Sequence, residues 1–196
     1  MYKKLIYIFI ISLIFSNYSF SEIIKNIEIF GNKRISDSTI LVLGDIKKGQ
    51  VFSNSSLNNS LKNLYETDFF SDIQFSLKNG LLKIEVEENP IIEKININGI
   101  KKQTFVENIY SSLSLKDRMS FTEYKFNKDI NLLKNILKTN GYYFSKINVS
   151  SKMDEKLNSI VLDIDIDLGE KAKIDEIIFI GDKKFKDKKL LELIAS

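Results

Sequence analysis

A short pattern occurs three times along this chain and limits what it can fold into. Each copy has alternating apolar residues, then a glycine, then basic and polar residues. The copies are IKNIEIFGNKRIS around Gly31, IEKININGIKKQT around Gly99 and IDEIIFIGDKKFK around Gly181. Because alternation with period two is typical of a half-buried strand and glycine permits a tight exit, each copy predicts a strand, a turn and a helix start.

The first repeat unit continues through two helices and a hairpin. Ser36 or Asp37 can cap a short helix that ends at Gly44, and Ser53 can cap a second helix. The second helix carries one apolar stripe, which consists of Leu57, Leu61, Leu64 and Tyr65. Two alternating runs follow, joined by Asn79-Gly80, a type I′ hairpin signal. The predicted order is strand, helix, helix, strand, strand.

The second unit repeats this order in different residues. Apolar residues at helical spacing mark its long helix: Phe126, Ile130, Leu133 and Leu137. Pro90, the only proline, cannot donate a ladder hydrogen bond and is predicted to end the first unit. The third copy has only a predicted strand at 177–180 and a helix start. Either the chain is the front part of a longer protein, or its last 20 or so residues are poorly ordered.

The first 21 residues have the pattern of a secretory signal peptide. Lys3 and Lys4 precede an apolar run at 5–15, and small residues follow at Ser19 and Ser21. The apolar run is shorter than the roughly 20 residues that cross a bilayer. We therefore expect an exported α+β protein with a signal peptide (1–21), a first domain (22–90), a second domain (91–170) and the truncated start of a third (171–196).

Composition argues against several classes of function. Histidine and cysteine are both absent, which removes the commonest general base, nucleophile and zinc ligands. Loss of Lys3 and Lys4 with the signal leaves 27 basic residues against 26 acidic ones, so the mature chain lacks the basic footprint that nucleic acid requires. We expect no enzyme activity, no cofactor, no metal site, no nucleic-acid partner and no small-molecule substrate.

Candidate chemical motifs each fail a simple requirement. The string DIDIDLGE, with Asp163, Asp165 and Asp167, lacks the glycine and the final glutamate of a calcium loop. The loop at 44–50 has the glycine spacing of a phosphate loop but carries Gln50 where lysine is needed. Glu87 and Glu88 are expected on the solvated surface. A hydrolase that uses carboxylates stays open only as an alternative, and it requires a cleft with a shifted acid.

The stretch 64–73, LYETDFFSDI, carries a resemblance to a known family together with GNKRIS and the hairpin. The first unit resembles the first POTRA (polypeptide-transport-associated) domain of the BamA family of outer-membrane protein assembly factors. NGYYFSKI takes the place of LYETDFFSDI in the second unit, which resembles the second such domain. The resemblance implies tandem POTRA domains, each β-α-α-β-β with two helices on a three-stranded mixed sheet. The junction residues are predicted to be structural: Leu64, Tyr65, Phe69, Phe70, Tyr143 and Phe144.

The resemblance also implies a role in holding unfolded outer-membrane proteins and docking assembly lipoproteins on the periplasmic side of the outer membrane. An extended client can add a strand to an open sheet edge, with little demand on sequence. By resemblance, the edge strand follows each junction, and the predicted client-binding residues lie there: Ile73, Gln74, Phe75, Ser76, Leu77, Lys78, Ile147, Asn148, Val149 and Ser150. The alternative, which the sequence supports equally, is that the outward polar residues of these strands are plain solvent-facing residues.

Two features of the family lie outside this sequence. A complete member is expected to carry five POTRA domains and a membrane β-barrel, and membrane contact would occur through that barrel. The POTRA region of a two-partner secretion transporter, or of a related translocation factor, is the main alternative, since it differs only in what lies downstream.

Overall fold

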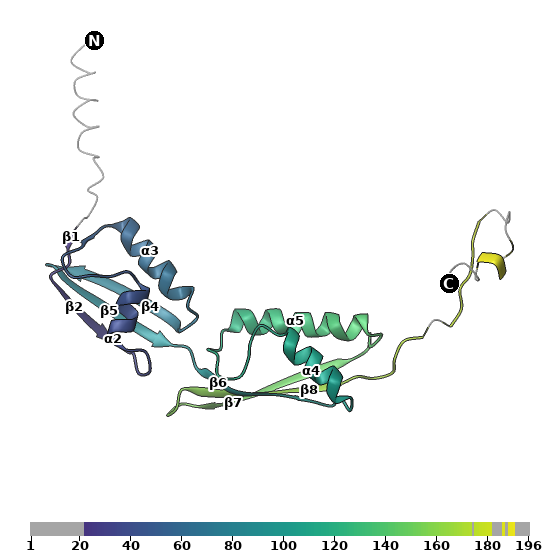
Figure 1. Ribbon diagram of the computed structural model, residues 1–196. Helices are drawn as coiled ribbons and strands as arrows, with labels where there is room; N and C mark the ends of the chain where they lie inside the picture. The colour runs from purple at the N-terminus through teal and green to yellow at the C-terminus, as the bar shows by residue number, and fades with distance from the viewer. Residues whose placement is uncertain (1–21, 174, 182–185, 187, 191–196) are drawn as a thin grey trace, which may run out of the picture.

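The computed structural model describes residues 22–173, 175–181, 186 and 188–190 of the chain, so the predicted signal peptide lies outside the described residues. Two α+β units follow one another, each with helices packed on one face of a three-stranded sheet (Figure 1). The buried apolar residues form two separate clusters, one in each unit. The predicted fold class is confirmed.

The first unit has the predicted order, with one small addition. Its two helices lie over a sheet of order β2-β5-β4, in which β2 is parallel and β4 antiparallel to β5. A two-stranded sheet of β1 and β3 is the addition. The elements are β1 (Glu22–Ile23), β2 (Asn26–Phe30), α2 (Asp37–Leu43), β3 (Val51–Phe52), α3 (Asn54–Tyr65), β4 (Phe70–Lys78) and β5 (Leu81–Glu88).

Local signals account for where these elements begin and end. The Ser36 hydroxyl accepts a hydrogen bond from the Thr39 N–H at the start of α2, and Ser53 caps α3 in the same way. Asn79 and Gly80 have φ values of 55° and 80°, as a type I′ turn requires. The predicted caps and the hairpin are therefore confirmed.

The second unit repeats the arrangement. Its sheet has the order β6-β8-β7, with β6 parallel and β7 antiparallel to β8. Thr122 caps the long helix, which carries the predicted apolar stripe. The elements are β6 (Ile91–Asn98), α4 (Gln103–Ser112), α5 (Glu123–Thr139), β7 (Lys146–Asp154) and β8 (Ser159–Asp167).

The repeated glycine has the same structural cause in both units. Gly31 and Gly99 have φ values of 87° and 88°, a region that side chains rarely adopt. A Cβ at Gly31 would collide with the carbonyl oxygen of Val86, and one at Gly99 with that of Ile166. Each glycine thus lets the chain leave the first strand in close contact with the central strand of its sheet.

The third repeat differs from the prediction. No strand forms at 175–180 in the described part of the chain, and Ile178 and Ile180 are 70% and 95% exposed. The predicted strand at 177–180 is therefore wrong there, because alternation specifies a strand only when a neighbour pairs with it. Residues 188–190 are helical, and most of the predicted helix start lies outside the described residues.

Candidate functional site

Strand β4 lies at one edge of the first sheet and contains the first predicted client-binding segment. Gln74, Ser76 and Lys78 are exposed, whereas Phe75 and Leu77 are half-buried on the core side. Ile73, the other residue predicted in this segment, is buried. The side chains of the strand are thus anchored on one face only, and its backbone has a neighbour on one side only.

The register shows which backbone groups of β4 point outward. A two-residue turn closes the hairpin at Lys78 and Leu81, so alternate residues from Lys78 backwards bond to β5. The N–H and C=O groups of Ile73, Phe75 and Leu77 therefore point away from the sheet. The Ile73 N–H donates to the Tyr65 hydroxyl at 3.1 Å. Among the described residues, no acceptor forms a hydrogen bond with the N–H of Phe75 or Leu77.

Strand β7 holds the second predicted client-binding segment and is more open than β4. It pairs only with β8, and Asn148, Val149 and Ser150 are all exposed, whereas Ile147 is half-buried. Val149 and Met153 lie opposite the buried residues Ile164 and Ile160, yet they are 39% and 57% exposed. The core side of β7 is thus poorly covered.

The opposite edges of the two sheets leave less of their backbone open to strand addition. The segment at 117–120 runs along β6, where the Ile95 N–H donates to the Asp117 carboxylate at 2.9 Å and the Ile92 N–H to the Met119 carbonyl at 2.8 Å. In the first unit, β2 is only five residues long. Covered or short edges resist strand addition, so β4 and β7 are the accessible edges.

The junction residues of the first unit pack between helix α3 and the sheet. Leu64 and Phe70 are buried, and the Phe69 and Phe70 rings meet edge to face with centroids 6.3 Å apart. Tyr65 is 42% exposed and contributes its hydroxyl to the edge of β4. The junction therefore both closes the core and caps the first outward amide of the strand.

The second unit lacks this arrangement, contrary to the predicted match. Tyr143 and Phe144 are 59% and 76% exposed, and Tyr142 instead packs on the core beside Phe105. A bulge at the start of β4 turns Phe70 inward, whereas β7 begins only at Lys146 and has no such bulge. The expectation that Tyr143 and Phe144 pack a junction is wrong.

Glu88 is buried, which corrects its predicted place on the solvated surface. Its Oε1 accepts hydrogen bonds from the backbone N–H groups of Lys33, Arg34 and Ile35 at 2.7, 2.9 and 3.0 Å. Arg34 Nε reaches Oε2 at 3.0 Å. The partners lie 53–55 residues away in the sequence, so only the Arg and Glu charges themselves could have hinted at this pairing.

The environment of Glu88 fits an anchor rather than an acid or base. Burial works to raise the pKa of this carboxyl, but the hydrogen bonds from Ile35, Lys33 and Arg34, with the Arg34 charge, hold the pKa below its usual value. The carboxylate stays ionised at neutral pH, and its hydrogen bonds hold the loop after β2 against the end of β5. Glu87 beside it remains exposed.

The two domains touch through contacts that the sequence did not indicate. Lys125 at the start of α5 forms an ion pair with Asp68, the residue before the Phe69-Phe70 pair. The Asn158 side-chain amide donates to the Glu88 carbonyl at 3.0 Å. No pattern in the sequence singles out Asp68, Lys125 or Asn158, because each contact depends on how the domains meet.

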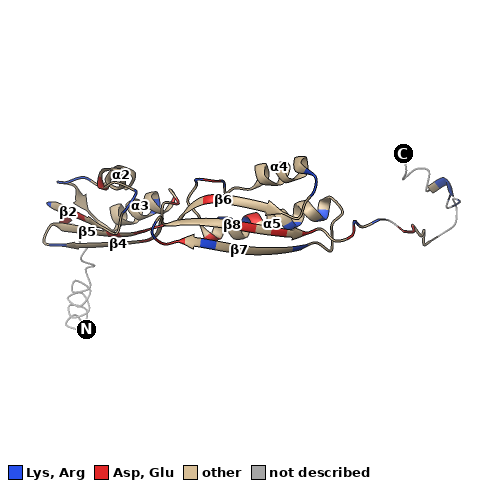
Figure 2. Ribbon diagram, turned by 90° about the horizontal axis from the view of Figure 1, so that it is seen from below, with Lys and Arg blue, Asp and Glu red and all other residues tan. Residues whose placement is uncertain are grey.

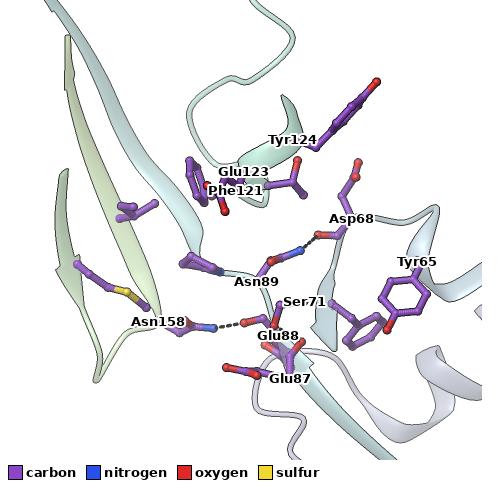
Figure 3. A pocket seen from close by; sticks show the side chains of 15 residues that line it. Tyr65, Asp68, Ser71, Glu87, Glu88, Asn89, Phe121, Glu123, Tyr124 and Asn158 are labelled. Atoms are coloured by element: carbon purple, nitrogen blue, oxygen red, sulfur yellow. Dashed lines mark hydrogen bonds between the residues drawn. The ribbon is translucent and has the colours of Figure 1, made fainter. Parts of the chain in front are cut away.

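A cleft of about 650 Å³ lies beside these contacts. In Figure 3, Phe121 and Glu123 come from the second domain and Tyr65 and Ser71 from the first, and dashed lines mark the hydrogen bonds of Asn89 and Asn158. The whole lining is Tyr65, Asp68, Phe70, Ser71, Glu87, Glu88, Asn89, Pro90, Phe121, Thr122, Glu123, Tyr124, Met153, Asn158 and Ile160. The lining thus combines seven aromatic or apolar residues with eight polar ones, four of which are acidic.

Charge elsewhere is scattered (Figure 2). Strand β8 carries the acidic residues that resemble part of a calcium loop, on the face of the sheet away from the core. There the Asn96 and Asn98 side-chain amides donate to Asp163 and Asp165 at 2.7 and 3.0 Å. Of the helices in the described ranges, none has the length and apolarity to cross a membrane.

A domain-family profile decides the relationship. The POTRA family, described as "Surface antigen variable number repeat", matches residues 22–89 and again residues 90–169. The chain belongs to the POTRA family. The two matches coincide with the two sheets and their helices, and the family resemblance predicted from the junction and the glycine repeat is confirmed.

Full-length relatives agree with this assignment. The outer membrane protein assembly factor BamA of Neisseria meningitidis is 29% identical over 175 residues, which is 88% of this chain and 22% of that protein. BamA of Neorickettsia risticii is 26% identical over 191 residues, 94% of this chain and 25% of that protein. The POTRA chain therefore spans about a quarter of the length of these relatives.

A solved structure supports the fold. The N-terminal domain of Omp85 from Thermosynechococcus elongatus superimposes with a TM-score of 0.50 at 12% identity and covers 88% of this chain and 75% of that one. At this identity the likeness concerns the architecture of the POTRA domains alone.

Proposed function

We propose that this chain is the periplasmic POTRA region of an outer-membrane β-barrel assembly factor that holds unfolded outer-membrane proteins by strand addition. Its relatives named BamA support the assembly role, and the free backbone groups at the edge of β4 support the mode of holding. The outward N–H groups of Phe75 and Leu77 carry the proposal most directly, since a client backbone can accept from them.

Strand addition suits a partner that must bind many sequences and release them. The affinity comes from main-chain hydrogen bonds, which depend little on the client's side chains. Each such bond contributes only about 1 kcal/mol net, so a short contact is weak and reversible. The exposed polar side chains Gln74 and Ser76 add no apolar patch that would hold one client preferentially.

The same proposal includes the docking of accessory lipoproteins and a place on the periplasmic side of the outer membrane. It is a non-catalytic role. The hydrolase alternative loses its support at Glu88, because a carboxylate with a lowered pKa and four hydrogen-bond donors cannot act as a general acid at neutral pH.

Amide hydrogen exchange tests the proposal residue by residue. In the free protein, the Phe75 and Leu77 amides should exchange fast, and those of Gln74 and Ser76 slowly, because only the latter bond to β5. Addition of a ten-residue peptide of alternating polar and apolar residues should protect Phe75 and Leu77 and leave the other two unchanged.

A Tyr65→Phe variant provides an internal control, since loss of the hydroxyl should speed exchange at Ile73 alone in the free protein. Peptide binding that protects neither Phe75 nor Leu77, and none of the β7 amides, would count against strand addition.

A further inference from the structure

The two open edge strands meet at the cleft between the domains. Ser71 is the second residue of β4, Met153 is the second last residue of β7, and both line the cleft. Figure 2 shows β4 and β7 on the same side of the molecule, each the outermost strand of its sheet.

The direction of the two strands is the same. Strand β7 runs toward the cleft and ends there, whereas β4 begins there and runs away from it. A segment that pairs antiparallel with β7 and continues past the cleft therefore meets β4 in the antiparallel sense too. If one strand ran the other way, a straight client could not keep one pairing sense along both.

We propose that a single extended client segment adds to both edges at once and places a tyrosine side chain in the cleft. This inference rests on the proposed strand addition and extends it from one domain to two. Each strand has nine residues, which corresponds to roughly 30 Å at about 3.3 Å per residue. The matching client segment has on the order of 20 residues, including those that cross the cleft.

The lining of the cleft favours tyrosine at the crossing point. Phe121, Tyr124 and Met153 offer apolar contacts for a ring. Glu87 and Glu123 also line the cleft, and neither is in an ion pair within the described part of the chain, so each can accept a hydrogen bond from a phenol.

The contacts between the domains keep the two edges aligned. The Asp68–Lys125 ion pair and the hydrogen bond from Asn158 to the Glu88 carbonyl lie beside the cleft and join the domains. Once one half of the client is bound, the other half is held close to the second edge at a high effective concentration. Linked sites of this kind raise the overall affinity without any new type of contact.

Peptide titration of the whole protein tests this inference. The probes are a peptide of about 20 alternating residues with a central tyrosine, its two halves, and the same long peptide with serine in the centre. We expect the long peptide to bind at least about tenfold more tightly than either half. Replacing its central tyrosine by serine should remove a large part of that gain.

Matched protein variants locate the crossing point. Met153→Ser should reduce the ratio between the affinities of the long peptide and its halves. Leu157→Ser changes an exposed apolar residue in the turn after β7 that does not line the cleft and is not among the predicted client-binding residues, so it should leave that ratio unchanged.

The outcomes separate the two proposals. If the halves bind but the long peptide gains nothing, the two-domain client is refuted and strand addition stands. If no peptide protects an edge amide, both proposals fail. An unchanged affinity for the long peptide with central serine, or an equal effect of Met153→Ser and Leu157→Ser on the ratio, would refute the tyrosine position.

Discussion

The sequence pattern pairs Phe70 with Phe144, but the structure places them differently, so the two residues test how far the repeat determines stability. Phe70 is 3% exposed and packs against the core of the first domain, whereas Phe144 is 76% exposed. Truncation of a buried phenylalanine costs about 3 to 5 kcal/mol. Truncation of an exposed one changes the free energy of unfolding by no more than about 0.5 kcal/mol.

The expected loss is large for a domain of this size. A domain of 68 residues, the length of the first family match, has a free energy of unfolding of roughly 3 to 10 kcal/mol. Phe70→Ala should therefore remove much of the stability of the first domain or unfold it. With a urea m-value of about 1 to 3 kcal/mol/M, the midpoint of that domain should fall by at least about 1 M.

Urea titration followed by two-dimensional NMR separates the domains, because each amide reports its own unfolding. Phe70→Ala should lower the midpoint of the first-domain amides and leave those at 103–167 in place, while Phe144→Ala should shift neither group. Phe70→Leu, which keeps most of the apolar volume, should lie between Phe70→Ala and the unchanged protein. Equal losses from the two alanine variants would refute the assignment of Phe70 as a core residue.

Three further expectations concern single contacts. Because the pKa of Glu88 is lowered in the folded state, its stabilisation is present above its ordinary pKa of 4.5 and is lost as the pH falls through the folded value. Urea titration should thus show a deficit for Glu88→Gln at pH 7 that shrinks at pH 3, and a deficit that grows in acid would contradict this. Lys125→Ala should lower the free energy of unfolding of either domain by less than about 1 kcal/mol, because the ion pair with Asp68 is partly exposed. It should loosen the relative orientation of the two domains, which residual dipolar couplings measure. Lys128→Ala is the matched control on the same helix and should leave the couplings unchanged. Gly99→Ala should cost the second domain more than about 2 kcal/mol in the same titration, and wild-type stability would show that the collision with the Ile166 carbonyl is relieved cheaply.

The sequence was informative wherever the cause of a structure is local. The hydroxyls of Ser36 and Ser53 bond to amides three residues on, and the Asn79-Gly80 turn depends on those two residues alone. The glycine repeat was also visible, because both copies avoid the same collision. These signals were sufficient to predict the order of helices and strands.

The missed features depend on distant partners. Glu88 was expected in solvent because its donors lie more than 50 residues away in the loop after β2. The match between Phe144 and Phe70 failed because a bulge at the start of β4 turns the Phe70 side chain toward the core. No residue type in the sequence predicts this bulge. The strand at 177–180 lacked a neighbour among the described residues, and periodicity cannot supply one.

The bonded outer edge of β6 has a consequence for the proposed addition of extended chains at β7. A sheet with two open edges can accept one strand on each side and so link successive copies into a growing fibre. The segment at 117–120 bonds to Ile92 and Ile95, so the first half of the outer edge of β6 is closed to a further strand. A strand that joins at β7 would extend this sheet to four strands, while only the last few residues of β6 stay open on the other side. An edge that short resists strand addition, so a loaded domain would be poorly suited to polymerise through β6.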